Sequence, residues 1–167
     1  MTQRYTVRVI KDHLVFCAGH FISYEGDKCE RLHGHNYRTA VEVEGPLDEN
    51  HYVFDFIALK LLTKSITDEL DHRMLLPTRN PHIRVEYVDG SMHVKYRDRE
   101  WRFPADDCVL LPLENTTAER LARYIGERLR ENLRRERNFV PEVLRVEVEE
   151  GPGQSATWEW RRGSDGN

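Results

Sequence analysis

Apolar and polar residues alternate near both ends of the chain, and this period of two predicts β-strands. Gly45-Pro46 ends one alternating run, and Gly151-Pro152-Gly153 separates the last two. These breaks define where each predicted strand stops. The predicted strands cover residues 4–11, 13–22, 37–44, 143–149 and 156–160.

Apolar residues at helical spacing predict two helices between these strands. The first begins after Asp55, a suitable N-cap, and runs to about Leu70. The second runs from about Thr116 to Arg135, and Thr116 with Glu119 fits a capping box. The two apolar stripes are Leu59, Leu62, Ile66 and Leu70, then Leu121, Ile125, Leu129 and Leu133.

The segment 83–103 reads as a β-hairpin, because alternating runs flank Asp89-Gly90, a strong tight-turn signal. The order strand, strand, helix, hairpin, helix, strand, strand predicts an α+β fold with largely antiparallel pairing. The polar residues 163–167 are expected to be a disordered tail. We therefore expect a single domain over residues 1–162.

Composition narrows the class of protein. A chain of 167 residues suits one domain with a real core. Its formal net charge of −4 argues against a general nucleic-acid binder. The sequence shows neither an apolar run of membrane-span length nor the apolar stretch of a signal peptide. With 3 cysteines, a cytoplasmic protein with reduced thiols is expected.

Three histidines form the clearest candidate site. His33 and His35 are two positions apart on a predicted strand, so their side chains share a face. His20 ends the preceding strand and can face this pair. Three imidazoles with an open fourth position are typical of catalytic zinc. Polar histidines on a strand surface explain the pattern about equally well.

Cys29 lies in the loop that leads to this strand. A thiol beside a divalent cation has a lowered pKa and acts as a base or nucleophile. As a fourth zinc ligand, it would instead close a structural site. Cys17 and Cys108 have apolar neighbours in sequence and are expected to be inert core residues.

Acidic residues and one further histidine supply weaker candidates. Asp71-His72 follows the first helix and suits either a proton relay or a histidine that complements the helix dipole. Glu150 ends a strand, where its carboxylate could bind two N–H groups of a heterocycle. Capping alone explains Glu119 and Asp55.

Six segments, in this order along the chain, resemble the 6-pyruvoyl-tetrahydropterin synthase and 6-carboxy-tetrahydropterin synthase family. The similarity covers nearly the whole chain, so it is far more specific than His-Gly-His alone. The segments are Phe16–His20, Lys28–Tyr37, Val53–Phe56, Leu70–Leu76, Asn115–Glu119 and Val146–Gly153.

The resemblance implies a tunnelling fold (T-fold): an antiparallel four-stranded sheet with two helices on one face, assembled into an oligomeric barrel. It implies a homohexamer, formed as a dimer of trimers, with active sites at the subunit interfaces. The family's zinc ligands correspond to His20, His33 and His35. Its catalytic residues correspond to Cys29, Asp71 and His72. Its pterin-anchoring glutamate corresponds to Glu150, and Thr117 and Glu119 fall where the family has residues near the pterin.

The resemblance also implies a substrate, 7,8-dihydroneopterin triphosphate. The spacing Cys29-x-x-x-His33 resembles the 6-carboxy-tetrahydropterin synthases of queuosine and deazapurine synthesis. Glu30 adds the spacing Glu-x-x-His-Gly-His, which in some members cleaves the side chain to 6-hydroxymethyl-dihydropterin for folate synthesis. An ordinary surface role for Glu30 is slightly favoured. 6-Pyruvoyl-tetrahydropterin synthesis is a further alternative.

Two departures from shorter family members bear on substrate preference. The segment 79–107 is longer than in compact relatives and reads as an insertion. Thr116 stands where relatives often have proline, and Gly151 where they often have threonine. Outside pterin synthesis, the alternatives are another T-fold enzyme and a non-enzymatic, zinc-stabilised binding module.

Overall fold

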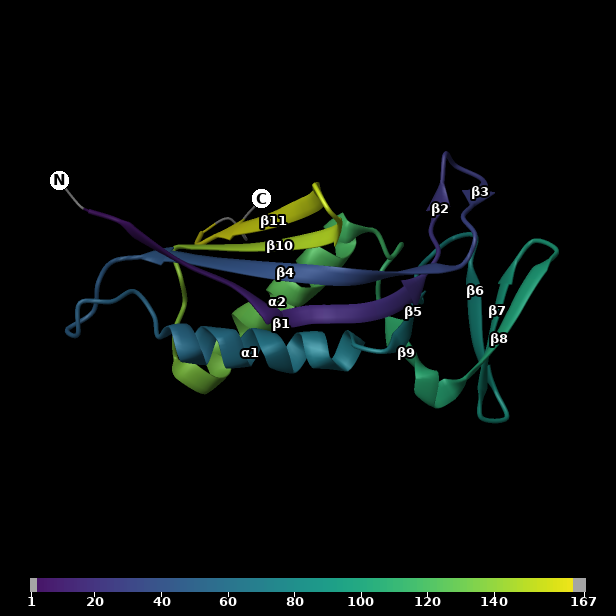
Figure 1. Ribbon diagram of the computed structural model, residues 1–167, viewed down its shortest axis with the longest axis horizontal. Helices are drawn as coiled ribbons and strands as arrows, with labels where there is room; N and C mark the ends of the chain where they lie inside the picture. The colour runs from purple at the N-terminus through teal and green to yellow at the C-terminus, as the bar shows by residue number, and fades with distance from the viewer. Residues whose placement is uncertain (1–2, 164–167) are drawn as a thin grey trace.

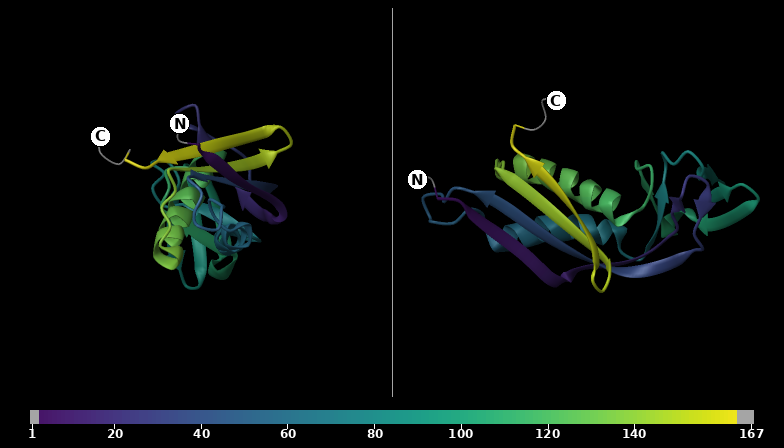
Figure 2. Two further views of the ribbon diagram at one scale, coloured as in Figure 1. Left: turned by 90° about the vertical axis from the view of Figure 1, so that its left-hand side faces the viewer. Right: turned by 90° about the horizontal axis from the view of Figure 1, so that it is seen from above.

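The computed structural model describes residues 3–163, in which two helices cover one face of a six-stranded sheet, the main sheet (Figure 1). The view along the long axis in Figure 2 shows both helices on the same side. They are α1 (Phe56–Leu70) and α2 (Ala118–Arg137). In spatial order the strands are β11 (Gln154–Arg161), β10 (Val143–Gly151), β4 (His33–Gly45), β1 (Tyr5–His20), β5 (Arg73–Pro77) and β9 (Cys108–Leu111).

The predicted four-stranded antiparallel sheet is confirmed as β11-β10-β4-β1, but it is not the whole sheet. The short strands β5 and β9 extend it in parallel orientation. The apolar periodicity does not identify them, because both are short, continuous apolar runs without alternation. They bring the segment after α1 alongside the end of β1.

The two strands predicted over 4–11 and 13–22 are one strand, β1. Its pairing with β4 shifts between Ile10, which pairs with Ala40, and Val15, which pairs with Arg38. The extra residues of β1 bulge out, which allows both halves of the strand to turn their apolar side chains to the helices. The break in alternation marks this bulge and not a turn.

Between β5 and β9 the chain forms a three-stranded sheet, called here the small sheet (Figure 1). It consists of β6 (Arg84–Val88), β7 (Ser91–Tyr96) and β8 (Arg99–Pro104), followed by a 3₁₀ turn at Ala105–Asp107. The segment predicted as a two-stranded hairpin therefore has a third strand, β8. Its second turn contains Arg97 at a φ of 55° and no glycine, so the usual turn signal is missing.

Helix α2 begins two residues later than predicted. The side chain of Thr117, not Thr116, caps it by accepting from the Arg120 amide. The capping box predicted for Thr116 and Glu119 is wrong, because Thr116 is fully buried and turned toward His20. Asp55 caps α1 as predicted, accepting from the Ala58 amide at 2.7 Å.

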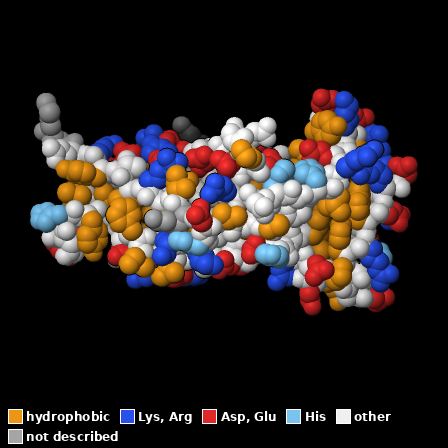
Figure 3. Space-filling model, viewed as in Figure 1, with side chains coloured by type: hydrophobic (Ala, Val, Ile, Leu, Met, Phe, Trp, Pro, Cys, Tyr) orange, Lys and Arg blue, Asp and Glu red, His pale blue; other side chains and the backbone are white. Residues whose placement is uncertain are grey.

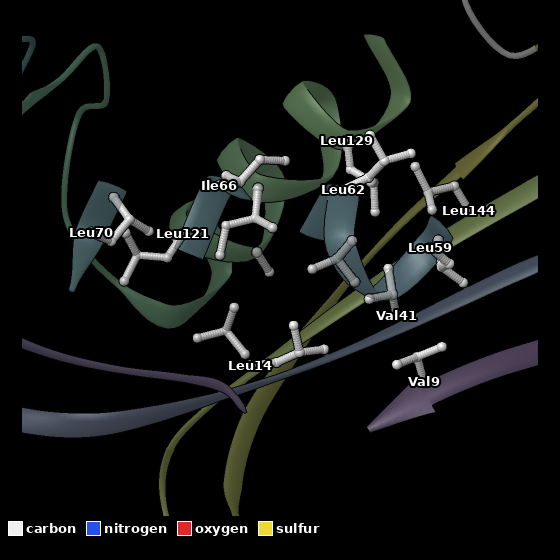
Figure 4. Close-up of a cluster of buried hydrophobic side chains, with 14 of the residues drawn as sticks. Val9, Leu14, Val41, Leu59, Leu62, Ile66, Leu70, Leu121, Leu129 and Leu144 are labelled. Atoms are coloured by element: carbon white, nitrogen blue, oxygen red, sulfur yellow. The ribbon is translucent and has the colours of Figure 1, made fainter. Parts of the chain in front are cut away.

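The main core lies between the helices and the main sheet (Figure 4). Each fully buried leucine contributes about 1.5–3 kcal/mol to the free energy of unfolding. A second apolar cluster, the junction cluster, joins the small sheet to Phe21 and β5. In Figure 3 apolar side chains lie over the small sheet, while acidic and basic side chains intermingle elsewhere.

No helix within residues 3–163 has the length and apolar character needed to cross a membrane. Gly163 ends the described chain, and the rest of the predicted tail over 163–167 lies outside the described residues.

Gly126 allows α2 to approach β11 closely. A Cβ atom at this glycine would lie 2.2 Å from Cε3 of Trp158 and 2.3 Å from its Cζ3. Alanine normally stabilises a helix interior, but here the overlap dominates. We expect Gly126→Ala to lower the free energy of unfolding by about 1–3 kcal/mol, measured by chemical denaturation. In a Trp158→Leu background the same substitution should cost less, and an equal cost would contradict the clash.

Candidate metal centre and adjoining cleft

Paired strands bring the three predicted histidines together. His20 on β1 pairs with His33 on β4, and Ala18 pairs with His35. The side chains therefore share the helix-covered face of the main sheet. The ring centroids of His20 lie 4.9 Å from His33 and 5.2 Å from His35, and those of His33 and His35 are 4.8 Å apart.

Backbone carbonyls orient two of these rings. His20 Nδ1 lies 2.9 Å from the Thr116 carbonyl, and His33 Nδ1 lies 2.8 Å from the Arg31 carbonyl. A carbonyl only accepts, so each Nδ1 must carry the proton. In the neutral ring, Nε2 then bears a lone pair. A backbone carbonyl that accepts from Nδ1 and leaves Nε2 for the ion is typical of metal-bound histidine.

Glu150 on β10 completes the cluster. Its Oε1 lies 3.1 Å from His20 Nε2 and 3.0 Å from His35 Nε2. These three residues and His33 each offer one ligand atom, and the four atoms lie within 4.8 Å of one another. Val148, two positions before Glu150, is buried on the helix-covered face of the main sheet. The pairing of β10 with β11 shifts between Glu149 and Gly151, at the position of Glu150. We name these four residues the His₃Glu cluster.

The chemistry of this cluster fits a divalent cation. Within residues 3–163, the buried Nε2 atoms of His20 and His35 have no hydrogen-bond partner. Burial lowers the pKa of His20, although Thr116 and Glu150 oppose the effect. The ring is therefore kept neutral and able to coordinate. At His20 the Nε2 lone pair faces the Glu150 carboxylate, and a cation between the two would relieve their repulsion.

A cleft of about 360 Å³ opens beside the cluster. Thr117 and Glu119, at the start of α2, line it together with His20 and Glu150. The shifted start of the helix frees Glu119 from the predicted capping role, and its side chain is exposed. The remaining lining residues are Ile22, Glu30, Ala118, Gln154, Ser155 and Ala156.

Glu30 lies in this cleft, although an ordinary surface role was slightly favoured from sequence. Its Oε2 accepts from the Ile22 amide at 3.2 Å and lies 4.0 Å from His33 Nε2. A carboxylate therefore stands beside the metal cluster. The spacing Glu-x-x-His-Gly-His was the signal that could have identified it.

Cys29 has a different environment. Its partly buried side chain packs against the junction cluster, and Sγ lies 3.5 Å from the Glu30 carbonyl oxygen. Burial raises the pKa of this thiol, Arg99 lowers it and Glu30 raises it further. Among the described residues, Cys29 belongs neither to the His₃Glu cluster nor to the lining of the cleft.

Asp71 and His72 form a hydrogen-bonded pair. His72 Nδ1 lies 2.9 Å from Asp71 Oδ2, and Asp71 Oδ1 accepts from the Cys17 amide at 2.8 Å. Although burial opposes it, these contacts lower the pKa of Asp71. The pair adjoins a second cleft of about 530 Å³, which His33, Arg73 and His72 help to line. The side chain of His72 is 82% exposed.

The prediction that Cys17 is a core residue is wrong. Cys17 is exposed because strand alternation places it opposite Phe16 and Ala18, which are buried. Cys108, also expected in the core, is half-buried and packs against the junction cluster.

Comparison with known proteins places this chain in a family. The family model for 6-pyruvoyl tetrahydropterin synthase matches residues 9–160. The chain belongs to the 6-pyruvoyl tetrahydropterin synthase family. The resemblance noted from the sequence is thereby confirmed, as is the mixed α+β arrangement of the fold.

Individual members of this family are similar over most of the chain. A putative 6-carboxy-5,6,7,8-tetrahydropterin synthase of Methanocaldococcus jannaschii is 33% identical over 153 residues, covering 91% of this chain and 89% of the relative. One from Pyrococcus horikoshii is 37% identical over 134 residues, covering 79% and 80%. A solved Plasmodium vivax 6-pyruvoyltetrahydropterin synthase, a catalytic-residue mutant with alanine in place of glutamate, matches with a TM-score of 0.89. It is 29% identical, and the match covers 95% of this chain and 99% of that one.

The His₃Glu cluster should bind one divalent cation per chain. We expect His35→Ala to abolish stoichiometric binding, because the cluster loses one of its converging nitrogen atoms. Cobalt absorption and elemental analysis measure the occupancy. His51→Ala, outside the cluster, is the control and should bind normally. Equal cobalt binding by the wild type and His35→Ala would rule out this cluster as the metal centre.

Proposed function

We propose that this protein is a zinc-dependent pterin synthase that acts on 7,8-dihydroneopterin triphosphate as a 6-carboxy-tetrahydropterin synthase. The observation that carries this proposal is the His₃Glu cluster, opening on a cleft lined by Thr117 and Glu119. The similar proteins from M. jannaschii and P. horikoshii, named as putative enzymes of this activity, support the choice of product.

In this proposal His20, His33 and His35 hold the zinc ion. Zinc would supply Lewis acidity, polarising the hydroxyls of the substrate side chain and acidifying the adjacent C–H bonds. The neutral ligands preserve the charge of the ion, and the Thr116 and Arg31 carbonyls hold two of the rings in the required tautomer.

Residues of the cleft would recognise the pterin ring. A carboxylate has two oxygen atoms that can accept from two adjacent N–H groups, as it does from the two parallel N–H donors of an arginine. We assign this role to Glu150, which lies at the boundary between the metal cluster and the cleft and in this proposal contacts the pterin instead of the zinc ion. Thr117 and Glu119 line the same space and would contact the ring edge.

Proton transfer is assigned to Cys29 and to the Asp71-His72 pair. Burial raises the pKa of Cys29, and a positive charge placed near the thiol would favour its thiolate form. Bound zinc would supply such a charge. Asp71 fixes the orientation of His72, which leaves Nε2 free to exchange a proton with substrate.

The exposed position of His72 supports the proposal that a neighbouring subunit completes the site. Within the described residues, no strand pairs with the outer edge of β11. The edge of β1 that faces away from β4 pairs with β5 only at Ala18 and Gly19, so most of that edge is also without a partner strand. Such edges are templates for pairing between copies. We propose a homo-oligomeric barrel, a dimer of trimers, in which His72 serves the cleft of another subunit.

Glu30 supports a second candidate function, side-chain cleavage to 6-hydroxymethyl-dihydropterin. Its carboxylate is in the cleft, whereas the Cys29 thiol packs against the junction cluster. The similar P. vivax enzyme also has a catalytic glutamate. A carboxylate can remove a proton at neutral pH without a lowered pKa, so it suits a different step from the thiol.

Product analysis distinguishes these functions. We expect the zinc-loaded wild type to convert 7,8-dihydroneopterin triphosphate to 6-carboxy-tetrahydropterin, identified by mass. Cys29→Ala should lower this rate by about 10²–10⁴-fold, the usual contribution of a positioned base. Cys108→Ala is the matched cysteine control.

The same assay contains the outcomes that contradict the proposal. If hydroxymethyl-dihydropterin is the product and Glu30→Gln abolishes it, side-chain cleavage replaces the primary function. A pyruvoyl product would indicate 6-pyruvoyl-tetrahydropterin synthesis. If the protein binds zinc but turns over no pterin, the chain is better described as a zinc-stabilised binding module.

Subunit mixing tests the shared site. Cys29→Ala and His72→Ala should each be inactive alone. Co-expression in equal amounts should restore about a quarter of the sites by random mixing, because one subunit supplies the thiol and another the histidine. Cys29→Ala mixed with the double variant is the control and should stay inactive. No recovery in verified mixed oligomers would place both residues in one chain's site.

A further inference from the structure

The hairpin that joins His20 to His33 is supported by the small sheet. This hairpin consists of β2 (Ser23–Tyr24) and β3 (Lys28–Cys29), and it stands beside β6–β8 in Figure 1. At its tip, the Tyr96 hydroxyl donates to the Asp27 carbonyl, and Arg97 Nη2 donates to Asp27 Oδ2 at 3.0 Å. The small sheet therefore contacts the hairpin far from the metal cluster.

A second contact lies at the base of the hairpin. Nη1 of Arg99, on β8, donates to the carbonyls of Cys29 at 3.2 Å and Glu30 at 3.1 Å. The guanidinium carbon lies 4.7 Å from the ring centroid of Trp101, a cation–π contact that restricts its position. One half-buried side chain thus fixes two consecutive peptide groups.

Trp101 also supports the other end of the same hairpin. Its ring stacks on Phe21 with centroids 4.3 Å apart and planes 23° apart. Phe21 is buried and directly follows His20. Arg99 and Trp101, two positions apart on one face of β8, therefore contact both chain segments that enter the metal centre.

We propose that Arg99 is a positioning residue, which holds the backbone of Cys29 and Glu30 and so fixes the direction of each side chain for the proposed reaction. This inference rests on the proposed function, but its structural part does not depend on the identity of the substrate. The small sheet is then part of the active-site framework.

The physical reason lies in the backbone carbonyls of the segment between the hairpin and β4, which has no regular secondary structure of its own. The Glu30 amide donates to the Ile22 carbonyl at 2.9 Å, while the Glu30 carbonyl has a weak thiol donor in Cys29 Sγ, and both this carbonyl and that of Cys29 still need a strong donor. Arg99 satisfies both. Without it, water replaces the guanidinium, and the side chains of Cys29 and Glu30 lose their fixed directions. A displacement of about 1 Å in such groups costs on the order of 10²-fold in rate.

The test compares Arg99→Ala with Arg102→Ala in the zinc-loaded protein. Arg102 is a matched control because it lies on β8, is exposed and donates within the small sheet, to Ser91 Oγ at 3.1 Å. Hydrogen–deuterium exchange by mass spectrometry follows the peptide over 22–32. Turnover of 7,8-dihydroneopterin triphosphate gives kcat and KM, and elemental analysis gives the zinc content.

We expect Arg99→Ala to exchange faster over 22–32 alone and to lose about 10- to 100-fold in kcat, with similar KM and zinc content. Arg99→Lys keeps the charge without the forked donor and should recover only part of the rate. Arg102→Ala should match the wild type. Unchanged exchange over 22–32 in Arg99→Ala would overturn the positioning role, whatever the rate.

If Arg99→Ala exchanges faster over 22–32 but keeps the wild-type kcat, the positioning role is also overturned, because the backbone restraint then has no effect on the reaction. If the wild type turns over no pterin, the proposed function fails. In that case the exchange comparison still decides whether Arg99 restrains the hairpin.

Discussion

The register between β1 and β4 is the constraint on which the rest of the site depends. Because His20 pairs with His33, and Ala18 with His35, the three imidazoles lie on one face within a few ångströms. A slip of one residue would turn one strand's side chains to the opposite face. The bulge between Ile10 and Val15 absorbs the mismatch upstream, so the apolar faces of both halves of β1 meet the same core.

The metal centre is an extension of the hydrophobic core. Phe16 stacks on Tyr37 at 4.8 Å, and the rings of His20 and His35 pack against Tyr37 at 5.9 Å and 5.4 Å. Burial raises the pKa of Tyr37, so its hydroxyl remains neutral beneath the site. These aromatic rings exclude water from one side of the cluster. The lower local dielectric strengthens the attraction between a bound cation and the cluster.

The sequence could predict those parts of the molecule whose signals are local. The apolar period of α1 and its cap at Asp55, and the two-residue spacing of His33 and His35, each follow from one segment. The positions of β5 and β9 could not be predicted, since their parallel partners are far apart in the chain. Likewise, no local pattern shows that Glu150 meets His20 and His35, because a shift in β10 pairing decides this.

Cys29 and Glu30 illustrate how a backbone restraint can select chemistry. Successive side chains of an extended segment point to opposite sides, so these two cannot both face the cleft in one backbone conformation. In this structure the carboxylate faces the cleft and the thiol faces the junction cluster. Thiol chemistry in this backbone conformation therefore requires a neighbouring subunit to build a second wall around Cys29. The exposed His72 and the sheet edges that no described strand covers are where such a subunit would bring its groups.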